Sequence, residues 1–127
     1  MEHENIIELY DWTKSSKGDR LLLVLQYCSK GDLENFLEHR QDAQEPLQDW
    51  EVYRLTYEIA LALYYLKAEC DPPILHGDLK PLNIFIHEDG SLKLGDFGAA
   101  AQVKGKIKGN KHATQFLTQT YSSPERL

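Results

Sequence analysis

The spacing of apolar residues near the start of the chain predicts a β-hairpin. Two short apolar runs, residues 6–12 and 20–27, are separated by residues 13–19, which are rich in Lys, Ser and Gly. A polar segment of this kind between two apolar runs is typical of a hairpin turn. The second run contains five consecutive apolar residues, Leu21 to Leu25. A run without alternation predicts a strand that is covered on both faces.

Two helices are expected after this hairpin. Leu33, Phe36 and Leu37 stand at helical spacing after a polar break at residues 29–32. From residue 48 to about residue 70, apolar residues recur at steps of three and four, as in a long helix with one buried face. These residues are Val52, Leu55, Ile59, Leu63 and Leu66. The sequence Asp71-Pro72-Pro73 is expected to end the helix.

The rest of the chain predicts a second hairpin and then a loop. Residues 84–87 and 91–94 resemble short strands, and the sequence Glu88-Asp89-Gly90 between them favours a turn. Residues 99–121 show no clear period, so we expect a long loop there. The length of 127 residues allows one domain or part of a larger one.

Composition and charge exclude several classes of protein. Twenty acidic against 14 basic residues give a net charge of −6, which argues against non-specific nucleic-acid binding. Four lysines within residues 104–111 could form a basic patch, but a solvated loop is the commoner interpretation. No apolar run approaches the roughly 20 residues of a membrane span, and Cys28 and Cys70 are too isolated for a disulfide or zinc site. We therefore expect a cytoplasmic or nuclear protein without nucleic-acid or membrane partners.

The chemistry-bearing residues lie between positions 75 and 98, in the sequences LHGDLKPLNIFI and LGDFG. Phosphoryl transfer from ATP needs a proton acceptor, a cation near the transferred phosphate and two oxygen donors for magnesium. Asp78, Lys80, Asn83 and Asp96 supply this set. An Asp and a Lys two positions apart on an extended loop can converge on one reacting centre. Asn83 can then share a metal ion with Asp96 from the following hairpin.

These sequences resemble the eukaryotic protein kinases. Residues 76–83 are similar to the kinase catalytic loop, Asp96-Phe97-Gly98 resembles the metal-binding triplet, and Ser123-Pro124-Glu125 resembles the triplet that closes the activation segment. The resemblance implies an α+β, protein-kinase-like fold, ATP and Mg²⁺ as cofactors, and a protein substrate with a Ser or Thr hydroxyl. Lys80-Pro81 is similar to the serine/threonine subgroup. The hinge and the sequences NIFI and LKLGDFG resemble those of NIMA-related or stress-responsive kinases.

The resemblance also implies a role for each site residue. Asp78 and Lys80 would be catalytic, and Asn83 and Asp96 would bind the metal. Residues 1–28 would be the end of the small lobe and the hinge, and residues 29–127 the first part of the large lobe. The nucleotide would also contact residues of the hinge and the strand below it: Leu25 as gatekeeper, Gln26 to Cys28 through their backbone, Asp32 at the ribose and Phe85 beneath the adenine.

Some features depart from the family pattern. The sequence contains no Gly-rich phosphate loop and no Val-Ala-x-Lys strand. We therefore expect the isolated chain to be inactive, and a pseudokinase or kinase-derived binding module is the alternative function. Gly77 replaces the Arg that reads a phosphate on the activation loop, so phosphorylation is expected to matter little. On this view Gly77→Arg should change the rate only slightly.

Other residues have a structural interpretation beside the functional one. Asp32 either caps the helix that follows it or faces the ribose or a basic substrate, and the sequence leaves these interpretations open. His76 is expected to pack with Phe97 and Leu9 rather than to bind a metal. The tyrosines of the long helix, Tyr53, Tyr57, Tyr64 and Tyr65, are expected to be packing residues.

Overall fold

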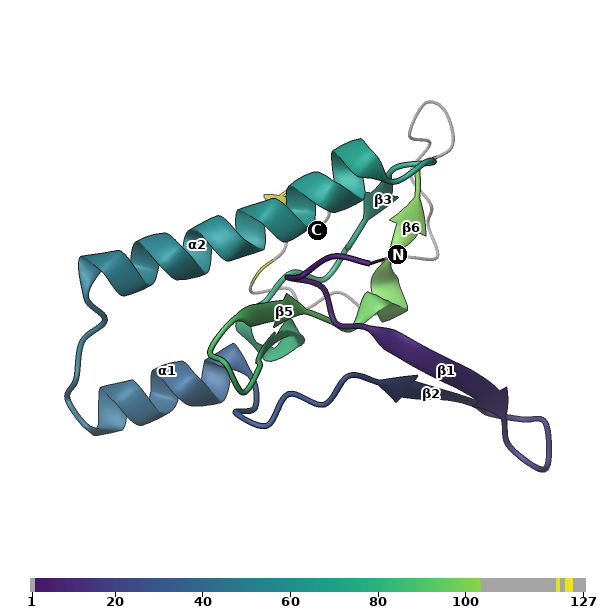
Figure 1. Cartoon of the computed structure of the whole chain (residues 1–127), viewed down its shortest axis with the longest axis horizontal. Helices are drawn as coiled ribbons and strands as arrows, with labels where there is room; N and C mark the ends of the chain where they lie inside the picture. The colour runs from purple at the N-terminus through teal and green to yellow at the C-terminus, as the bar shows by residue number, and fades with distance from the viewer. Residues whose placement is uncertain (1, 104–120, 122, 125–127) are drawn as a thin grey trace.

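A computed structural model describes residues 2–103, 121, 123 and 124 of the chain (Figure 1). Within these residues, helices and short strands form a mixed α and β fold, as the sequence predicts. The elements, in chain order, are β1 (Leu9–Lys14), β2 (Leu21–Leu25), α1 (Leu33–Asp42), α2 (Asp49–Tyr64), the π-helical turn η1 (Tyr65–Glu69), β3 (Ile74–Leu75), the 3₁₀ turn η2 (Pro81–Asn83), β4 (Ile84–Ile86), β5 (Leu92–Leu94), the 3₁₀ turn η3 (Phe97–Ala99) and β6 (Ala101–Gln102).

The first predicted hairpin is confirmed, but the prediction that its second strand is covered on both faces is wrong. β1 and β2 pair antiparallel from Leu9 opposite Leu25 to Lys14 opposite Leu21. The ribbon projects away from the helices (Figure 1), and every residue from Leu21 to Leu25 is between 42% and 60% exposed. The physical reason is that β1 and β2 form a two-stranded sheet, and neither face of it is covered within the described part of the chain.

Both predicted helices are present, and each begins at a capping residue. The N–H of Asn35 donates to the carboxylate of Asp32 at the start of α1. Gln48 and Glu51 form a reciprocal capping box at the start of α2, which satisfies N–H groups that the first turn leaves unpaired. Val52 was expected on the buried face but is 47% exposed, because it lies at the edge of the stripe, in the first turn.

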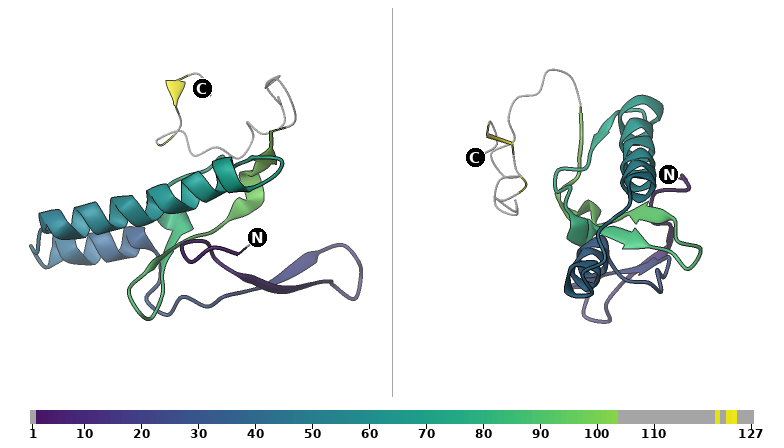
Figure 2. Two further views of the ribbon diagram at one scale, coloured as in Figure 1. Left: turned by 45° about the horizontal axis from the view of Figure 1, so that its top comes forward. Right: turned by 90° about the vertical axis from the view of Figure 1, so that its left-hand side faces the viewer.

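The hydrophobic core lies where the β4–β5 hairpin packs against both helices (Figure 2). β5 contacts α2, and β4 contacts α1. The buried core residues are Ile6, Leu33, Leu55, Ala62, Leu66, Ile84, Ile86, Leu92 and Leu94. Fully burying a side chain such as Leu92 or Leu94 contributes about 1.5–3 kcal/mol to folding. The core therefore holds the β4–β5 hairpin, which precedes Asp96, in a defined position.

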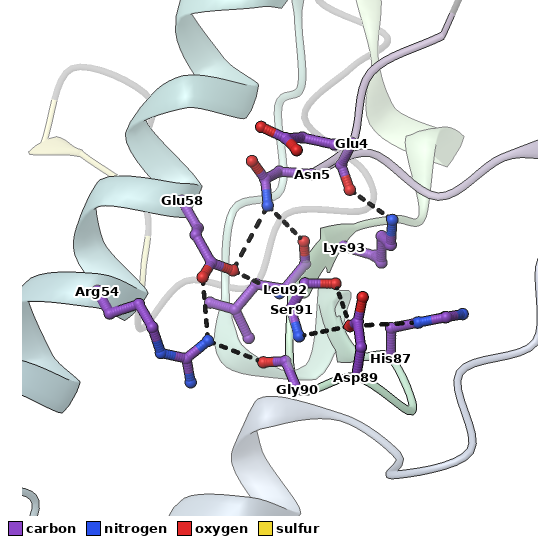
Figure 3. A network of polar contacts seen from close by, with 10 residues as sticks. All are labelled: Glu4, Asn5, Arg54, Glu58, His87, Asp89, Gly90, Ser91, Leu92 and Lys93. Atoms are coloured by element: carbon purple, nitrogen blue, oxygen red, sulfur yellow. Dashed lines mark hydrogen bonds and ion pairs between the residues drawn. The ribbon is translucent and has the colours of Figure 1, made fainter.

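A polar network ties the same hairpin to α2 and to the start of the chain (Figure 3). Glu58 of α2 accepts a hydrogen bond from the N–H of Leu92 at 2.6 Å. Arg54 donates both to Glu58, at 3.0 Å, and to the carbonyl of Gly90, at 2.9 Å. The side-chain amide of Asn5 donates to the carbonyl of Leu92 at 3.0 Å. Three segments that are distant in sequence are thus joined around one partly buried carboxylate.

The segment after residue 99 differs from the expected loop. β6 pairs antiparallel with β3, with Leu75 opposite Ala101 and Ile74 opposite Gln102. A strand of two residues carries no periodic pattern, so the sequence could not reveal it. The lysines of residues 104–111 lie outside the described residues, as does most of the predicted activation segment. Among the described residues, no helix is long and apolar enough to cross a membrane.

Candidate active site

Three of the predicted site residues meet in the loop between β3 and β4. The ammonium group of Lys80 lies 3.2 Å from one carboxylate oxygen of Asp78. The side-chain amide of Asn83 donates to the same oxygen at 3.1 Å and to the backbone carbonyl of Asp78 at 2.8 Å. The turn η2 makes this convergence feasible. Pro81 begins the turn, and the N–H of Asn83 returns to the carbonyl of Lys80.

This cluster is largely shielded from water. The side chains of Asp78 and Lys80 are only 13% and 16% exposed, and Asn83 is buried. Hydrogen bonds from a charged or amide donor to a carboxylate are short and directional, so they hold Asp78 in one orientation. Because the amide nitrogen of Asn83 faces Asp78, its amide oxygen points away from Asp78. That oxygen is an acceptor of the kind that Mg²⁺ prefers.

Asp96 joins the cluster through the backbone rather than through its side chain. The N–H of Gly95 donates to the carbonyl of Asn83 at 2.9 Å, which brings Asp96 beside Asn83. Asp96 itself has a left-handed backbone, with φ of 53°, and its carboxylate accepts a hydrogen bond from the N–H of Gly98 at 3.2 Å. Its side chain is exposed. Non-glycine residues rarely adopt this conformation, and such residues are often found at functional sites.

His76 links the two halves of the site and is buried. The N–H of Asp78 donates to its Nδ1 at 3.2 Å, so Nε2 carries the proton and donates to the carbonyl of Gly95 at 2.7 Å. The imidazole also meets the ring of Phe97 edge-on, with 5.0 Å between centroids. The expected packing against Phe97 is confirmed, whereas Leu9 is half exposed on β1.

Gly95 is the residue that sequence reasoning missed. Its backbone bonds on one side to Asn83 and on the other to His76. A methyl group on Gly95 would come within 2.7 Å of the ring of Phe85. The available signal was a glycine directly after a strand, which often marks a close approach by another group.

The surroundings of Gly77 add a steric constraint that the sequence did not reveal, and the small effect of Gly77→Arg on the rate stays a prediction. Gly77 has φ of +85°, where a side chain is strained. A methyl group on it would also lie 2.5 Å from the carbonyl oxygen of Ala99. Any larger residue must therefore displace the backbone that follows Phe97.

The predicted hinge residues lie between β2 and α1. Leu25 ends β2, and the N–H of Gln26 donates to the carbonyl of Glu8 at 2.8 Å. Cys28 is buried, and this burial raises the pKa of its thiol. The connector then pairs with β4, because the N–H of Ile86 donates to the carbonyl of Gly31 at 2.8 Å.

Of the two interpretations of Asp32, the structure supports the helix cap. One carboxylate oxygen accepts from the N–H of Asn35 at 2.9 Å and the other from its side-chain amide at 3.0 Å. Asp32 also forms a backbone bridge to Phe85 of β4. The hinge connector and the strand that carries Phe85 are therefore neighbours. Contact of Asp32 with a ribose stays a prediction.

The donor set fits magnesium better than a transition metal. No cluster of three or more His, Cys, Asp or Glu side chains that could hold a metal ion occurs among the described residues. The amide oxygen of Asn83 and the carboxylate of Asp96 are hard oxygen donors. Mg²⁺ is commonly bound by one or two such groups, and phosphate oxygens and water complete its shell.

Comparison with known proteins agrees with this geometry. The family model described as "Protein kinase domain" matches residues 1–127. The chain belongs to the protein kinase family. The mixed kinase-like fold expected from the sequence is thereby confirmed, and the relatives below confirm the expected resemblance to serine/threonine protein kinases.

Relatives of this kinase chain occur in distant organisms. It is 31% identical over 128 residues to "Probable serine/threonine-protein kinase nek2" of Dictyostelium discoideum, which covers 100% of the chain and 30% of that protein. It is 37% identical over 125 residues to "Serine/threonine-protein kinase RUNKEL" of Arabidopsis thaliana, covering 98% of the chain and 8% of that protein. A mouse kinase, "Serine/threonine-protein kinase Nek2", is 31% identical over 134 residues, covering 100% of the chain and 29% of its own length. The chain thus spans less than a third of each of these relatives.

Proposed function

We propose that this protein is a serine/threonine protein kinase that transfers the γ-phosphate of ATP to a Ser or Thr hydroxyl of a protein substrate. The observation that carries the proposal is the shared carboxylate oxygen of Asp78, which is bonded to both Lys80 and Asn83. A turn can form without three polar side chains that bond to one another and are shielded from solvent. They match the functional groups that phosphoryl transfer requires.

In this proposal each residue has one task. Asp78 orients the substrate hydroxyl and accepts its proton as the phosphate is transferred. Lys80 carries a positive charge beside Asp78 and contacts the transferred phosphate. Asn83 and Asp96 hold Mg²⁺, which neutralises charge on the phosphates when it is bound.

The nucleotide would lie between the hinge and β4. Backbone groups of Gln26 to Cys28 would bond the adenine, Leu25 would border it, and Phe85 would lie beneath it. The bridge between Asp32 and Phe85 supports this arrangement, because it holds the hinge connector against β4, the strand that directly follows Asn83. Residues 1–28 would then contribute the small-lobe side of the site and residues 29–127 the large-lobe side.

The test is phosphate transfer by the protein expressed from its complete gene. Labelled ATP, Mg²⁺ and a generic basic protein are supplied to wild type, Asp78→Asn and Asp42→Asn, where Asp42 is an exposed aspartate at the end of α1. We expect label on Ser or Thr, a loss of about 10²-fold or more for Asp78→Asn, and no change for Asp42→Asn. The 127-residue chain alone is expected to show no steady turnover.

The same preparation distinguishes the pseudokinase alternative. Calorimetric titration with ATP is carried out with Mg²⁺ and with a chelator, on wild type and Asp96→Asn. A kinase should bind ATP more tightly with Mg²⁺, and Asp96→Asn should lose that increment. No phosphate transfer, together with ATP binding that ignores both Mg²⁺ and Asp96→Asn, would overturn the proposed activity and favour a binding module.

A further inference from the structure

The turn between β4 and β5 contains a pair of neighbouring residues that can react with each other. Asp89 is followed by Gly90, and no other Asp or Asn in the sequence is followed by a glycine. In such a pair the main-chain nitrogen of the glycine can attack the side-chain carboxyl group before it, because no side chain shields that nitrogen. Asp89 is exposed, so water reaches the reacting atoms. The pair is therefore a candidate modification site outside the catalytic cluster.

The reaction is an isomerisation that needs only water. The nitrogen of Gly90 forms a bond to Cγ of protonated Asp89, and the carboxyl hydroxyl leaves as water together with the amide proton. The product is a five-membered succinimide ring, and water then adds to one of its two carbonyl groups. Addition at the former side-chain carbonyl restores aspartate. Addition at the main-chain carbonyl gives isoaspartate, in which the main chain runs through the side-chain carbon.

Hydrogen bonds occupy both reacting groups in the folded chain. The hydroxyl and the N–H of Ser91 donate to Oδ1 of Asp89 at 2.6 and 2.9 Å, and Nδ1 of His87 lies 3.3 Å from the same oxygen (Figure 3). The N–H of Gly90 donates to the carbonyl of His87 at 2.9 Å. The hydroxyl and the N–H of Ser91 also lower the pKa of Asp89, so the reactive, protonated form is rarer than in an ordinary aspartate.

We propose that Asp89-Gly90 is a latent isomerisation site, and that the hydrogen bonds from Ser91 to Asp89 keep it unreactive in the folded chain. For the attack, the carboxyl group must turn toward the nitrogen of Gly90 and gain a proton. Ser91 opposes both steps, because it places two donors on one oxygen of the carboxylate. The inference does not depend on the proposed kinase activity.

The position of the turn gives the modification a structural consequence. The carbonyl of Gly90 accepts from Arg54 at 2.9 Å, and the N–H of Leu92 donates to Glu58 at 2.6 Å. Isoaspartate at position 89 would lengthen the main chain by one atom directly before these two contacts with α2. The β4–β5 hairpin would then lose part of its fit to the helix, so the folded state has a reason to keep the pair unreactive.

The test is the rate at which isoaspartate appears at position 89 of the 127-residue chain at neutral pH. Peptide mapping by mass spectrometry measures it in wild type, in Ser91→Ala and in Ser29→Ala, the last at an exposed serine outside the turn. A free peptide of residues 87–93 supplies the rate without the fold. We expect wild type to react at least about 10-fold more slowly than the peptide. Ser91→Ala should react about two- to tenfold faster than wild type, and Ser29→Ala like wild type.

Two further comparisons separate the hydrogen bonds from the local sequence and from unfolding. Ser91→Ala in the free peptide should have little effect, and if it accelerated the peptide as much as the chain, the proposal would fail. Ser91→Thr keeps both donors, so that chain should react as slowly as wild type. If the alanine variant does not fold, wild type and Ser91→Thr must still react more slowly than the peptide. Equal rates in wild type and the peptide, or a folded Ser91→Ala chain as slow as wild type, would overturn the proposal.

Discussion

At the residue scale, Lys80 and Asp78 form an ion pair from which water is largely excluded. Removing one member of such a pair leaves a poorly solvated charge with fewer partners. We expect Lys80→Met to lower the free energy of unfolding by about 1–3 kcal/mol at neutral pH. Chemical denaturation followed by circular dichroism measures this. Lys67→Met, at an exposed lysine of η1, should change it by less than about 0.5 kcal/mol, and equal effects would contradict the importance of the pair.

A second residue-scale prediction concerns the turn between β4 and β5. Hydrogen bonds from the hydroxyl and the N–H of Ser91 lower the pKa of Asp89 to about 2, with a smaller contribution from His87. Because the pKa is lowered on folding, the stabilisation is present above the ordinary carboxyl pKa of about 3.9. It is lost as the pH falls toward 2.

NMR titration of the side-chain carboxyl group checks this. Ser91→Ala removes the hydroxyl and should raise the pKa of Asp89 toward its ordinary value, while the N–H bond keeps part of the shift. Ser29→Ala, at an exposed serine outside the turn, should leave it unchanged. If Asp89 of the wild type titrated near pH 4, the turn geometry described above would be wrong.

At the element scale, Glu58 connects α2 to the β4–β5 hairpin. Its carboxylate accepts from Leu92, Arg54 and, at 3.4 Å, Asn5. Glu58→Ala leaves these donors without that acceptor, which should cost about 1–3 kcal/mol of unfolding free energy. Glu58→Gln keeps one oxygen for the N–H of Leu92 and should cost less. Urea denaturation tests the order, with Glu38→Ala on α1 as an exposed control. Equal losses for Glu58→Ala and Glu38→Ala would contradict a structural role for the network.

The elements also show which parts of the structure the sequence could predict. Periodicity over many residues located α2, and turn residues located both hairpins, because these signals depend on neighbours in the chain. Burial of β2 depends on which segments pack against it, and these are not its neighbours in the chain. Its apolar run therefore predicted burial on both faces, whereas its residues are exposed. In the site, the two-residue spacing predicted the meeting of Asp78 and Lys80, whereas Asn83, predicted to share a metal with Asp96, also bonds to Asp78. Gly77 lies close to backbone atoms of Ala99, and residue types alone do not predict an approach between two main-chain segments.

At the scale of the whole molecule, the described residues expose a large apolar surface on the β1–β2 ribbon. Such patches and free strand edges favour association. We expect the 127-residue chain to bind a hydrophobic dye and to self-associate as its concentration rises. Leu21→Glu combined with Leu23→Glu, two exposed positions on one face of β2, should reduce dye fluorescence and association without lowering stability. Fluorescence and analytical ultracentrifugation measure both, and a monomer without dye binding would contradict this prediction.

The bonds that join Asn5 to Leu92 also set an order of events during synthesis. The two residues are 87 positions apart, so the amide of Asn5 leaves the ribosome long before its acceptor has been made. At about 5–20 residues per second, the delay is about 4–17 s. Leu94, which bonds through its backbone to Asn5 and Ile7, is equally late. Ile6, which is buried in the finished molecule, must therefore wait for several seconds in a nascent chain without its native neighbours. A chaperone that binds short apolar segments would have this interval in which to bind the one around Ile6.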